Sequence, residues 1–359
     1  MNSRKRVQAA LNRQPTDRVP VFMWFHPDMA VHFAEVLEIP PDRLPEAMGD
    51  DVRQAWVNNN YAMEGITHEH DGEGHTDVWG IEWVKSGPFN QVEHAPLENA
   101  DANKARGYGF PYDSVDELMR NMHPVVAEKD NYFIGCDVSP CAFEMLCRIR
   151  GMENAIMDLA ADPDLAGDLM DKCVDFARKL SEVACETLPL DWLWTGDDVG
   201  GQSGMIMSPA SWREMVKPRL ARVVEIGTEH NLPVAYHSCG AIRPIIPDLI
   251  EIGVTVLNPV QSTCPGMDPA ELKEEFGQDL SFMGGVDTQY LLPNGTADEV
   301  REATAELLEI MTEGGGYVLA ASHTIPPETP DENVFALYET AGISKEEIMD
   351  RAADIRRQS

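Results

Sequence analysis

An imidazole and a thiol stand two residues apart at His237 and Cys239, in the sequence PVAYHSCG. Side chains two positions apart on a β-strand leave it on the same side, so both groups could reach one ion. Imidazole and thiolate are ligands of Zn²⁺, and His323, which ends a second apolar run, is the expected third ligand. The spacing is equally compatible with a buried cysteine beside a hydrogen-bonded histidine. His323 could instead be a general acid or a rim histidine.

Five further polar residues end or follow apolar runs: Asp197, Asp198, Asn258, Gln261 and Asp287. In parallel α/β barrels, the catalytic residues lie at the carboxyl ends of the strands. We therefore expect Asp198 and Asp287 to be catalytic, by orienting the substrate or handling a proton. The other three are expected to bind substrate. The competing interpretation is that Asp197 and Asp198 cap the following loop and that Asn258, Gln261 and Asp287 make rim hydrogen bonds.

A second group of possible ligands lies in the segment THEHDGEGH, and it comprises His68, His70, Asp71, Glu73 and His75. A glycine-rich loop in solvent collects such residues without fixing their geometry, and no predicted strand holds them. We therefore do not predict a second metal site in this segment.

The elements that position these residues are apolar runs that end in polar or small residues, at 19–25, 132–139, 191–198, 233–239, 255–261, 281–287 and 317–323. Segments with helix signals lie between them, at 208–230, 241–253 and 296–316. Strands that alternate with helices predict a parallel sheet. An open dinucleotide-binding sheet is disfavoured because no GxGxxG motif follows an early strand.

The predicted fold is therefore a (β/α)8 TIM barrel of the α/β class, preceded by an N-terminal helix. The barrel is expected to form a single domain over residues 1–359, since α/β barrels are often this long. Residues 40–130 are less regular, and we interpret them as rim loops and short elements within that domain.

The chain has 28 basic and 61 acidic residues, which give a formal net charge of −33. Such a charge repels nucleic acid and anionic membrane surfaces. Its seven cysteines contain no CxxC pair, and the sequence shows neither an apolar signal sequence nor a membrane-length apolar stretch. These features predict a soluble cytoplasmic protein.

The sequence resembles the uroporphyrinogen decarboxylase superfamily, most closely its corrinoid-dependent methyltransferase and demethylase branch. The resemblance rests on GDDVGGQSGMIMSP, HSCG, LIEIGVTVLNPVQ, GMDPAELKEEFG, FMGGVDTQ and GGGYVLAASHTIPPETPDEN. It implies a (β/α)8 barrel in which zinc is held by a His-x-Cys pair and a later cysteine. The pair matches His237 and Cys239, whereas His323 occupies the position of the later cysteine.

This departure would change the charge of the site. One thiolate and two imidazoles leave a zinc site with a net positive charge, which favours an oxygen-bearing methyl donor. The segment VPVFMWFHPDMAVHF after the first strand lacks the arginine with which uroporphyrinogen decarboxylases grip a polycarboxylate. Decarboxylation of a porphyrinogen is therefore disfavoured.

The resemblance implies methyl transfer between a small methylated substrate and the cobalt of a corrinoid (cobalamin), and the charge of the site favours an O-methyl group in that substrate. The sequence contains no DxHxxG motif, so the corrinoid is expected on a separate partner protein. One alternative is a metal-independent lyase that uses Asp198 or Asp287, and another is a binding protein without chemistry. The family suggests a monomer or a homodimer.

Overall fold

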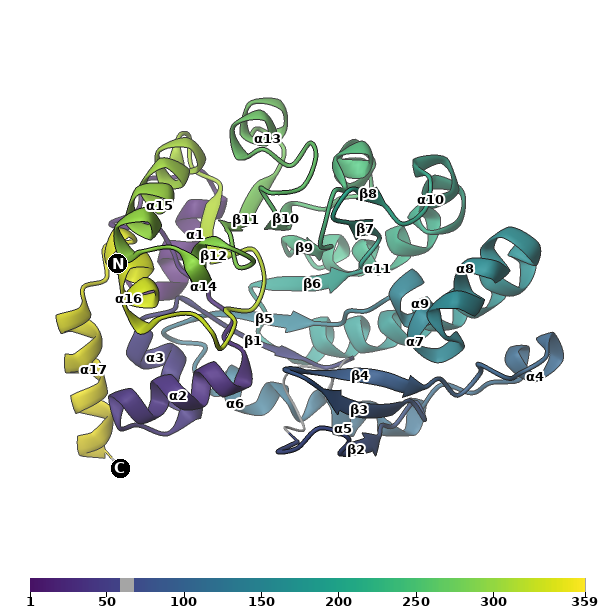
Figure 1. The fold of residues 1–359 in the computed structure, drawn as a ribbon. Coiled ribbons are helices and arrows are strands. Elements are labelled where there is room, and N and C mark those ends of the chain that lie inside the picture. Colours follow the sequence, from purple (N-terminus) through teal and green to yellow (C-terminus); the bar gives the residue numbers. More distant parts are fainter. Residues whose placement is uncertain (59–67, 359) are drawn as a thin grey trace.

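The computed structural model describes residues 1–58 and 68–358, and a curled parallel sheet lies at its centre (Figure 1). Its strands follow the order β1-β5-β6-β9-β10-β11-β12. Their bounds are Val52–Trp56 (β1), Phe133–Asp137 (β5), Trp192–Gly196 (β6), Val234–His237 (β9), Val256–Val260 (β10), Ser281–Val286 (β11) and Tyr317–Ala321 (β12).

An eighth extended segment, residues 20–25, closes this sheet. Val21 and Phe25 form parallel bridges with Leu319 and Ile325, beside β12. On the other side, the Asp51 backbone N–H donates to the Val21 carbonyl at 2.8 Å, just before β1 begins. The eight segments therefore form a barrel, which confirms the predicted (β/α)8 fold.

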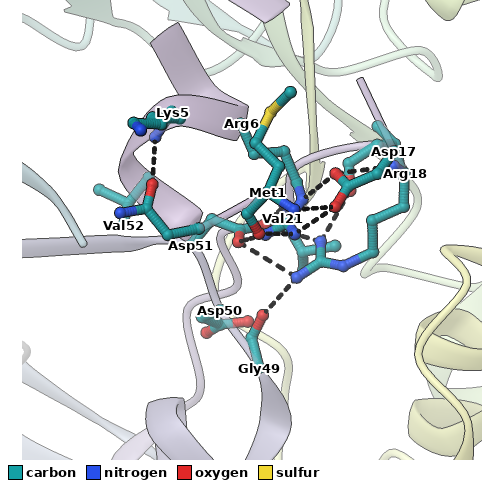
Figure 2. Close-up of polar contacts among 12 residues, drawn as sticks. Met1, Lys5, Arg6, Asp17, Arg18, Val21, Gly49, Asp50, Asp51 and Val52 are labelled. Atoms are coloured by element: carbon teal, nitrogen blue, oxygen red, sulfur yellow. Dashed lines mark hydrogen bonds and ion pairs between the residues drawn. The ribbon is translucent and has the colours of Figure 1, made fainter. Parts of the chain in front are cut away.

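The Asp51 carboxylate holds this closing seam together (Figure 2). It is fully buried, and it accepts hydrogen bonds from the Val21 N–H at 2.9 Å, Arg6 Nη1 at 2.6 Å and Arg18 Nη1 at 2.7 Å. A buried carboxylate needs such charged donors to offset its lost hydration. The contacts tie helix α1 (Ser3–Leu11), the first extended segment and β1 to one another.

Aromatic side chains fill the barrel interior. The Trp192 ring lies 5.0 Å from Phe133 and 5.3 Å from Trp194, and Trp194 lies 5.6 Å from Trp24. Val7 of α1 packs against the same buried cluster. Because alternate residues of a strand face the interior, this packing also fixes which side chains at the strand ends point into the barrel.

Helices surround the sheet in Figure 1, some packed on the sheet and others on neighbouring helices. They are α7 (Phe143–Arg150), α8 (Met152–Ala161), α9 (Pro163–Thr187), α10 (Pro209–Met215), α11 (Lys217–Glu229), α12 (Ile246–Glu251), α13 (Pro269–Phe276), α14 (Leu291–Asn294), α15 (Ala297–Thr312), α16 (Asp331–Thr340) and α17 (Lys345–Gln358). A capping box between Thr296 and Glu299 starts α15, as the sequence indicates. The segment predicted as one helix over 208–230 is two helices, since Val216 ends the first and Pro218 lies in the first turn of the second.

Among the described helices, none combines the length and apolar character that a membrane span requires.

Before β5, the chain forms short elements: α2 (Pro27–Leu37), the 3-10 turn Pro41–Arg43, α3 (Leu44–Met48), α4 (Ala102–Arg106), the 3-10 turn Tyr112–Ser114, α5 (Val115–Met119), α6 (Met122–Ala127) and an antiparallel sheet of β2 (Gly74–Thr76), β3 (Glu82–Ser86) and β4 (Phe89–His94). The interpretation of 40–130 as rim loops and short elements needs one correction, because β1 lies within it and is a barrel strand. Residues 59–67 of this region lie outside the described residues.

Candidate functional site

Three side chains with metal-binding atoms meet where β6 and β9 end. Asp198, His237 and Cys239 each place one ligand atom within 4.8 Å of the others. His237 Nε2 lies 3.6 Å from Cys239 Sγ and 3.7 Å from Asp198 Oδ1. Because β6 and β9 are neighbours in the sheet, Gly196 pairs with His237, and Asp198 follows two residues later. The predicted pair of His237 and Cys239 therefore lies together, and Asp198, which was predicted to be catalytic, joins them.

The loop after β9 is held in a fixed shape by its backbone. The Cys239 N–H donates to Asp198 Oδ1 at 2.8 Å, so these two candidate ligand residues are also hydrogen-bonded to each other. Gly240 has a φ of +83°, and a Cβ there would lie 2.6 Å from the Gly200 carbonyl carbon in the hairpin of β7 (Gly200–Gly201) and β8 (Gly204–Met205). Glycine therefore allows the hairpin to pack directly on the ligand loop.

Asn258 fixes the orientation of the His237 ring. Its Oδ1 lies 2.6 Å from His237 Nδ1, and Asn258 pairs with His237 across β10 and β9. Because an amide oxygen can only accept, Nδ1 carries the proton and Nε2 presents its lone pair to Cys239 and Asp198. Asn258 was predicted to bind substrate, and the structure places it behind the imidazole as its hydrogen-bond partner.

The donor set fits zinc. Bonds of about 2.0–2.3 Å in a tetrahedral site place ligand atoms about 3.3–3.8 Å apart, which matches the separations around His237 Nε2. Burial and the charge of Asp198 raise the pKa of Cys239 well above its ordinary value, so this thiol needs a cation to become a thiolate. With Asp198 in the set, one thiolate and one carboxylate balance a dication. The net positive site expected from the sequence depends on His323 taking that position.

His323 lies beside the cluster rather than within it. Its ring centroid is 6.5 Å from that of His237, and the rings meet edge to face. Burial and the nearby His237 lower the pKa of His323 to about 4, which keeps the imidazole neutral at neutral pH. Neutral imidazole can accept a proton, donate a hydrogen bond or bind a metal, so the prediction that His323 is a ligand stays a prediction.

Two of the predicted aspartates cap helices. The Asp197 side chain is fully buried, and its carboxylate accepts hydrogen bonds from the backbone N–H groups of Ala142, Phe143 and Glu144 at the start of α7. Burial raises the Asp197 pKa to about 7. Asp287 accepts N–H bonds from the turn at the start of α14, including that of Leu291 at 3.0 Å. The structure brings neither carboxylate into the ligand cluster.

Gln261 supports the ligand loop. Its Oε1 accepts the Gly240 N–H at 2.7 Å, and its Nε2 lies 3.3 Å from Gln202 Oε1 in the β7–β8 hairpin. Like Asn258, Gln261 was predicted to bind substrate, and the structure gives it a positioning contact on the backbone next to Cys239.

Three residues at the site were absent from the predicted set. The Trp24 and Trp194 rings lie 5.7 Å and 6.4 Å from the His237 ring and line the barrel beneath it. Both tryptophans fall within predicted strands, where alternation could have assigned them to the interior. Glu144 accepts the Asp198 N–H at 3.3 Å, and no sequence pattern links these two positions.

The histidine-rich segment before β3 is not part of the cluster of Asp198, His237 and Cys239. His68 Nε2 lies 2.9 Å from His75 Nδ1, and the Glu73 carboxylate accepts the backbone N–H groups of Glu69 and His70. The carboxylate of Glu73 therefore stabilises the loop itself.

The sequence profile of the uroporphyrinogen decarboxylase (URO-D) family matches residues 84–342. The chain is 25% identical over 201 residues to the methylated-thiol–coenzyme M methyltransferase of Methanosarcina mazei, covering 55% of this chain and 51% of that enzyme. It is 22% identical over 354 residues to the methylcobamide:CoM methyltransferase MtbA of Methanosarcina acetivorans, covering 94% of this chain and 97% of that enzyme. It thus spans about half of the first relative and nearly all of the second.

A uroporphyrinogen decarboxylase of Gloeobacter violaceus is 28% identical over 192 residues, covering 50% of this chain and 49% of that enzyme. Among solved structures, a methyltransferase from Methanosarcina mazei superposes with a TM-score of 0.71 at 21% identity, covering 95% of this chain and 98% of that chain. At that identity the superposition supports the fold alone. Because the URO-D profile covers more than half of the sequence, the chain belongs to the uroporphyrinogen decarboxylase (URO-D) family.

Proposed function

We propose that this chain is a zinc-dependent methyltransferase that moves a methyl group between a small methylated substrate and the cobalt of a corrinoid on a separate protein. The observation that carries the proposal is the cluster of Asp198, His237 and Cys239 at the mouth of the barrel. Relatives over half or more of the chain are named methyltransferases that act on coenzyme M.

Asp198, His237 and Cys239 would hold the ion, and a bound Zn²⁺ would supply Lewis acidity to the heteroatom that carries the methyl group. Asn258 keeps Nε2 of His237 unprotonated for this purpose. Gln261 and Gly240 hold the Cys239 loop in its position. Trp24 and Trp194 exclude water from the side of His237 that faces the barrel. His323, neutral at neutral pH, can donate a hydrogen bond to the substrate or accept a proton from it.

The ligand composition supports an oxygen-bearing methyl donor. A set with one thiolate, one carboxylate and one imidazole is harder than a thiolate-rich set, and harder sites prefer oxygen ligands. This support comes from the single thiolate and no longer from a net positive charge. An O-methyl substrate is therefore the proposed donor class.

The third ligand is open to a direct test. Our proposal places Asp198 in that position, and the sequence favours His323. We expect Asp198→Ala to weaken zinc binding more than His323→Ala, because the Asp198 oxygen lies within the cluster. Zinc affinities measured by competition with a chromophoric chelator would decide between them. A larger loss in the histidine variant would return His323 to the ligand set.

The reaction is tested by adding zinc-loaded protein and candidate O-methyl donors to cob(I)alamin and following methylcobalamin formation by its absorbance. We expect turnover that is lost on chelation, restored by zinc and abolished in Cys239→Ala. Carefully purified protein without stoichiometric metal, together with metal-independent turnover of a carboxylated substrate, would support the alternative lyase. Metal binding without turnover of any donor would support a binding protein.

A further inference from the structure

A cavity of about 490 Å³ lies against the ligand cluster, and Asp198 is part of its wall. β4, α7 and the β7–β8 hairpin supply other wall residues, among them Glu93, Glu144 and Ile206. The volume suits a small organic group. The cavity therefore lies where the part of a substrate that does not react would extend from a metal-bound atom.

The cluster opens on the side of this cavity. The Asp198 side chain is 41% exposed, whereas the side chain of His237, which is hydrogen-bonded to Asn258 and lies beside Trp24, is 12% exposed. A group bound at the ion next to Asp198 would therefore have room on the cavity side.

Part of the wall is apolar. Phe143 and Cys147 line it from α7, and Val92, Met152 and Ile206 are large apolar side chains that are 37%, 53% and 37% exposed at its border. Exposed apolar side chains grouped around a cavity favour an apolar ligand body.

The charge of the wall is negative. Arg148 is the basic residue in this wall, and its guanidinium is paired with Glu144 at 2.6 Å. Since the charge of Arg148 is offset by Glu144, the carboxylates of Glu93 and Glu98 give the wall two further negative charges. His94 Nδ1 lies 3.2 Å from Glu98 Oε1, and this imidazole offsets the charge of Glu98 only when it is protonated.

From these contacts we infer that the cavity binds the non-reacting part of the substrate and that this part is cationic or uncharged, never anionic. The inference rests on the proposed function, because it assumes that the reacting atom binds the ion beside Asp198. A carboxylate, sulfonate or phosphate in the cavity would lose hydration and face Glu93 and Glu98 without a free cation among the described wall residues. A cationic group would gain from the same carboxylates.

Three thiols of the form HS–CH₂–CH₂–X test the inference: thiocholine (cationic), 2-mercaptoethanol (neutral) and 2-mercaptoethanesulfonate (anionic). Each thiolate would bind Co²⁺ substituted for zinc, and the charge-transfer absorbance gives its affinity, corrected for the pKa of the free thiol. We expect thiocholine to bind about tenfold tighter than 2-mercaptoethanesulfonate, with 2-mercaptoethanol between them.

The double variant E93Q/E98Q should reduce this ratio to about twofold or less, because it removes the negative charge of both side chains and keeps their shape. The matched control, E302Q/E306Q, makes the same charge change at exposed positions of α15 and should leave the ratio unchanged. Tightest binding of the anionic thiol, or an equal ratio in all three proteins, would overturn the inference while the metal site stands. Absence of a cobalt spectrum would overturn the metal site and the inference with it.

Discussion

A single amide decides which nitrogen of His237 is available. Asn258 Oδ1 accepts a hydrogen bond from His237 Nδ1–H at 2.6 Å, so a residue outside the cluster of candidate ligands sets which nitrogen can bind a metal. Partners of this kind commonly change metal affinity by one to two orders of magnitude. The asparagine is therefore expected to matter almost as much as a ligand.

We predict that Asn258→Ala lowers zinc affinity about 10–100-fold, because the ring loses its fixed orientation and tautomer. Asn258→Asp keeps an acceptor oxygen and should retain most of the affinity. The measurement is chelator competition at fixed pH, with Asn103→Ala at an exposed position of α4 as the control. Equal affinities of Asn258→Ala and the native protein would contradict the role given to Asn258.

Asp50 makes the stability of the protein depend on pH. It is buried, accepts the Tyr338 hydroxyl at 2.7 Å, and has its pKa raised to about 7 chiefly by burial. Between its unfolded and folded pKa values, only the folded state retains the proton. The free energy of unfolding should therefore fall as pH rises from about 4 to about 7 and level off above that.

Asp50→Asn should remove this fall, because the amide has no proton to lose and can still accept from Tyr338. Relative to the native protein, the variant should gain about 2–4 kcal/mol between pH 4.5 and pH 8. Urea unfolding at several pH values gives this difference. Asp42→Asn, at an exposed position, should show no such gain. A constant difference across the pH range would mean that Asp50 is ionised when folded.

For the site residues at the strand ends, the sequence predicted their positions better than their roles. The spacing of His237 and Cys239 on one strand was enough to bring them together. Asp197, Asp198 and Asp287 share the same chemistry and the same location at strand ends, yet Asp198 belongs to the cluster of candidate metal ligands and the other two cap helices. The difference depends on whether a helix N-terminus lies within reach, which is a tertiary property that strand position does not encode.

At the scale of elements, the contact between the β7–β8 hairpin and the loop of Cys239 leaves the least room for a side chain. It requires glycine at position 240, because backbone atoms of Gly200 and Gly201 occupy the place that a Cβ would take. Gln261 then bonds to the Gly240 N–H from the end of β10. The geometry of the thiol is thus set by two neighbouring elements.

We predict that Gly240→Ala both destabilises the protein and weakens metal binding, because the hairpin must move away from the ligand loop. Gly72→Ala is the matched control, since Gly72 has a φ of +86° but no atom within 4 Å of the place that a Cβ would take. The control should cost about 1–2 kcal/mol for the left-handed backbone alone and leave affinity intact. Thermal unfolding and chelator competition measure the two effects, and equal losses in both variants would rule out the packing role.

The strands of the barrel differed in how well the sequence marked them. Apolar runs such as 191–198 and 317–323 were recognised because both faces of those strands are buried. β1 was not, since its sequence VRQAW carries Arg53 and Gln54 and lies among irregular segments. Gln54 accepts a hydrogen bond from the Trp192 indole at 2.8 Å, so a polar residue in this strand is satisfied inside the barrel.

For the whole molecule, the net charge of −33 should make stability depend on salt. Repulsion among surface carboxylates disfavours the compact state, and salt screens it. We expect the melting temperature to rise between about 0.05 and 0.5 M NaCl, and KCl at equal ionic strength should act alike. Calorimetry measures the shift. A fall with salt would show that surface ion pairs contribute more than the repulsion does.

The aromatic filling of the barrel has one more consequence, because it ends at His237, which is a proposed metal ligand. Trp24 and Trp194 lie 5.7 Å and 6.4 Å, ring to ring, from His237. Excitation energy of either indole can be transferred to a Co²⁺ ion bound at that imidazole, because Co²⁺ has absorption bands that accept the energy. Zn²⁺ has no such bands. Quenching of the intrinsic tryptophan fluorescence would therefore report the binding of Co²⁺ without an attached label.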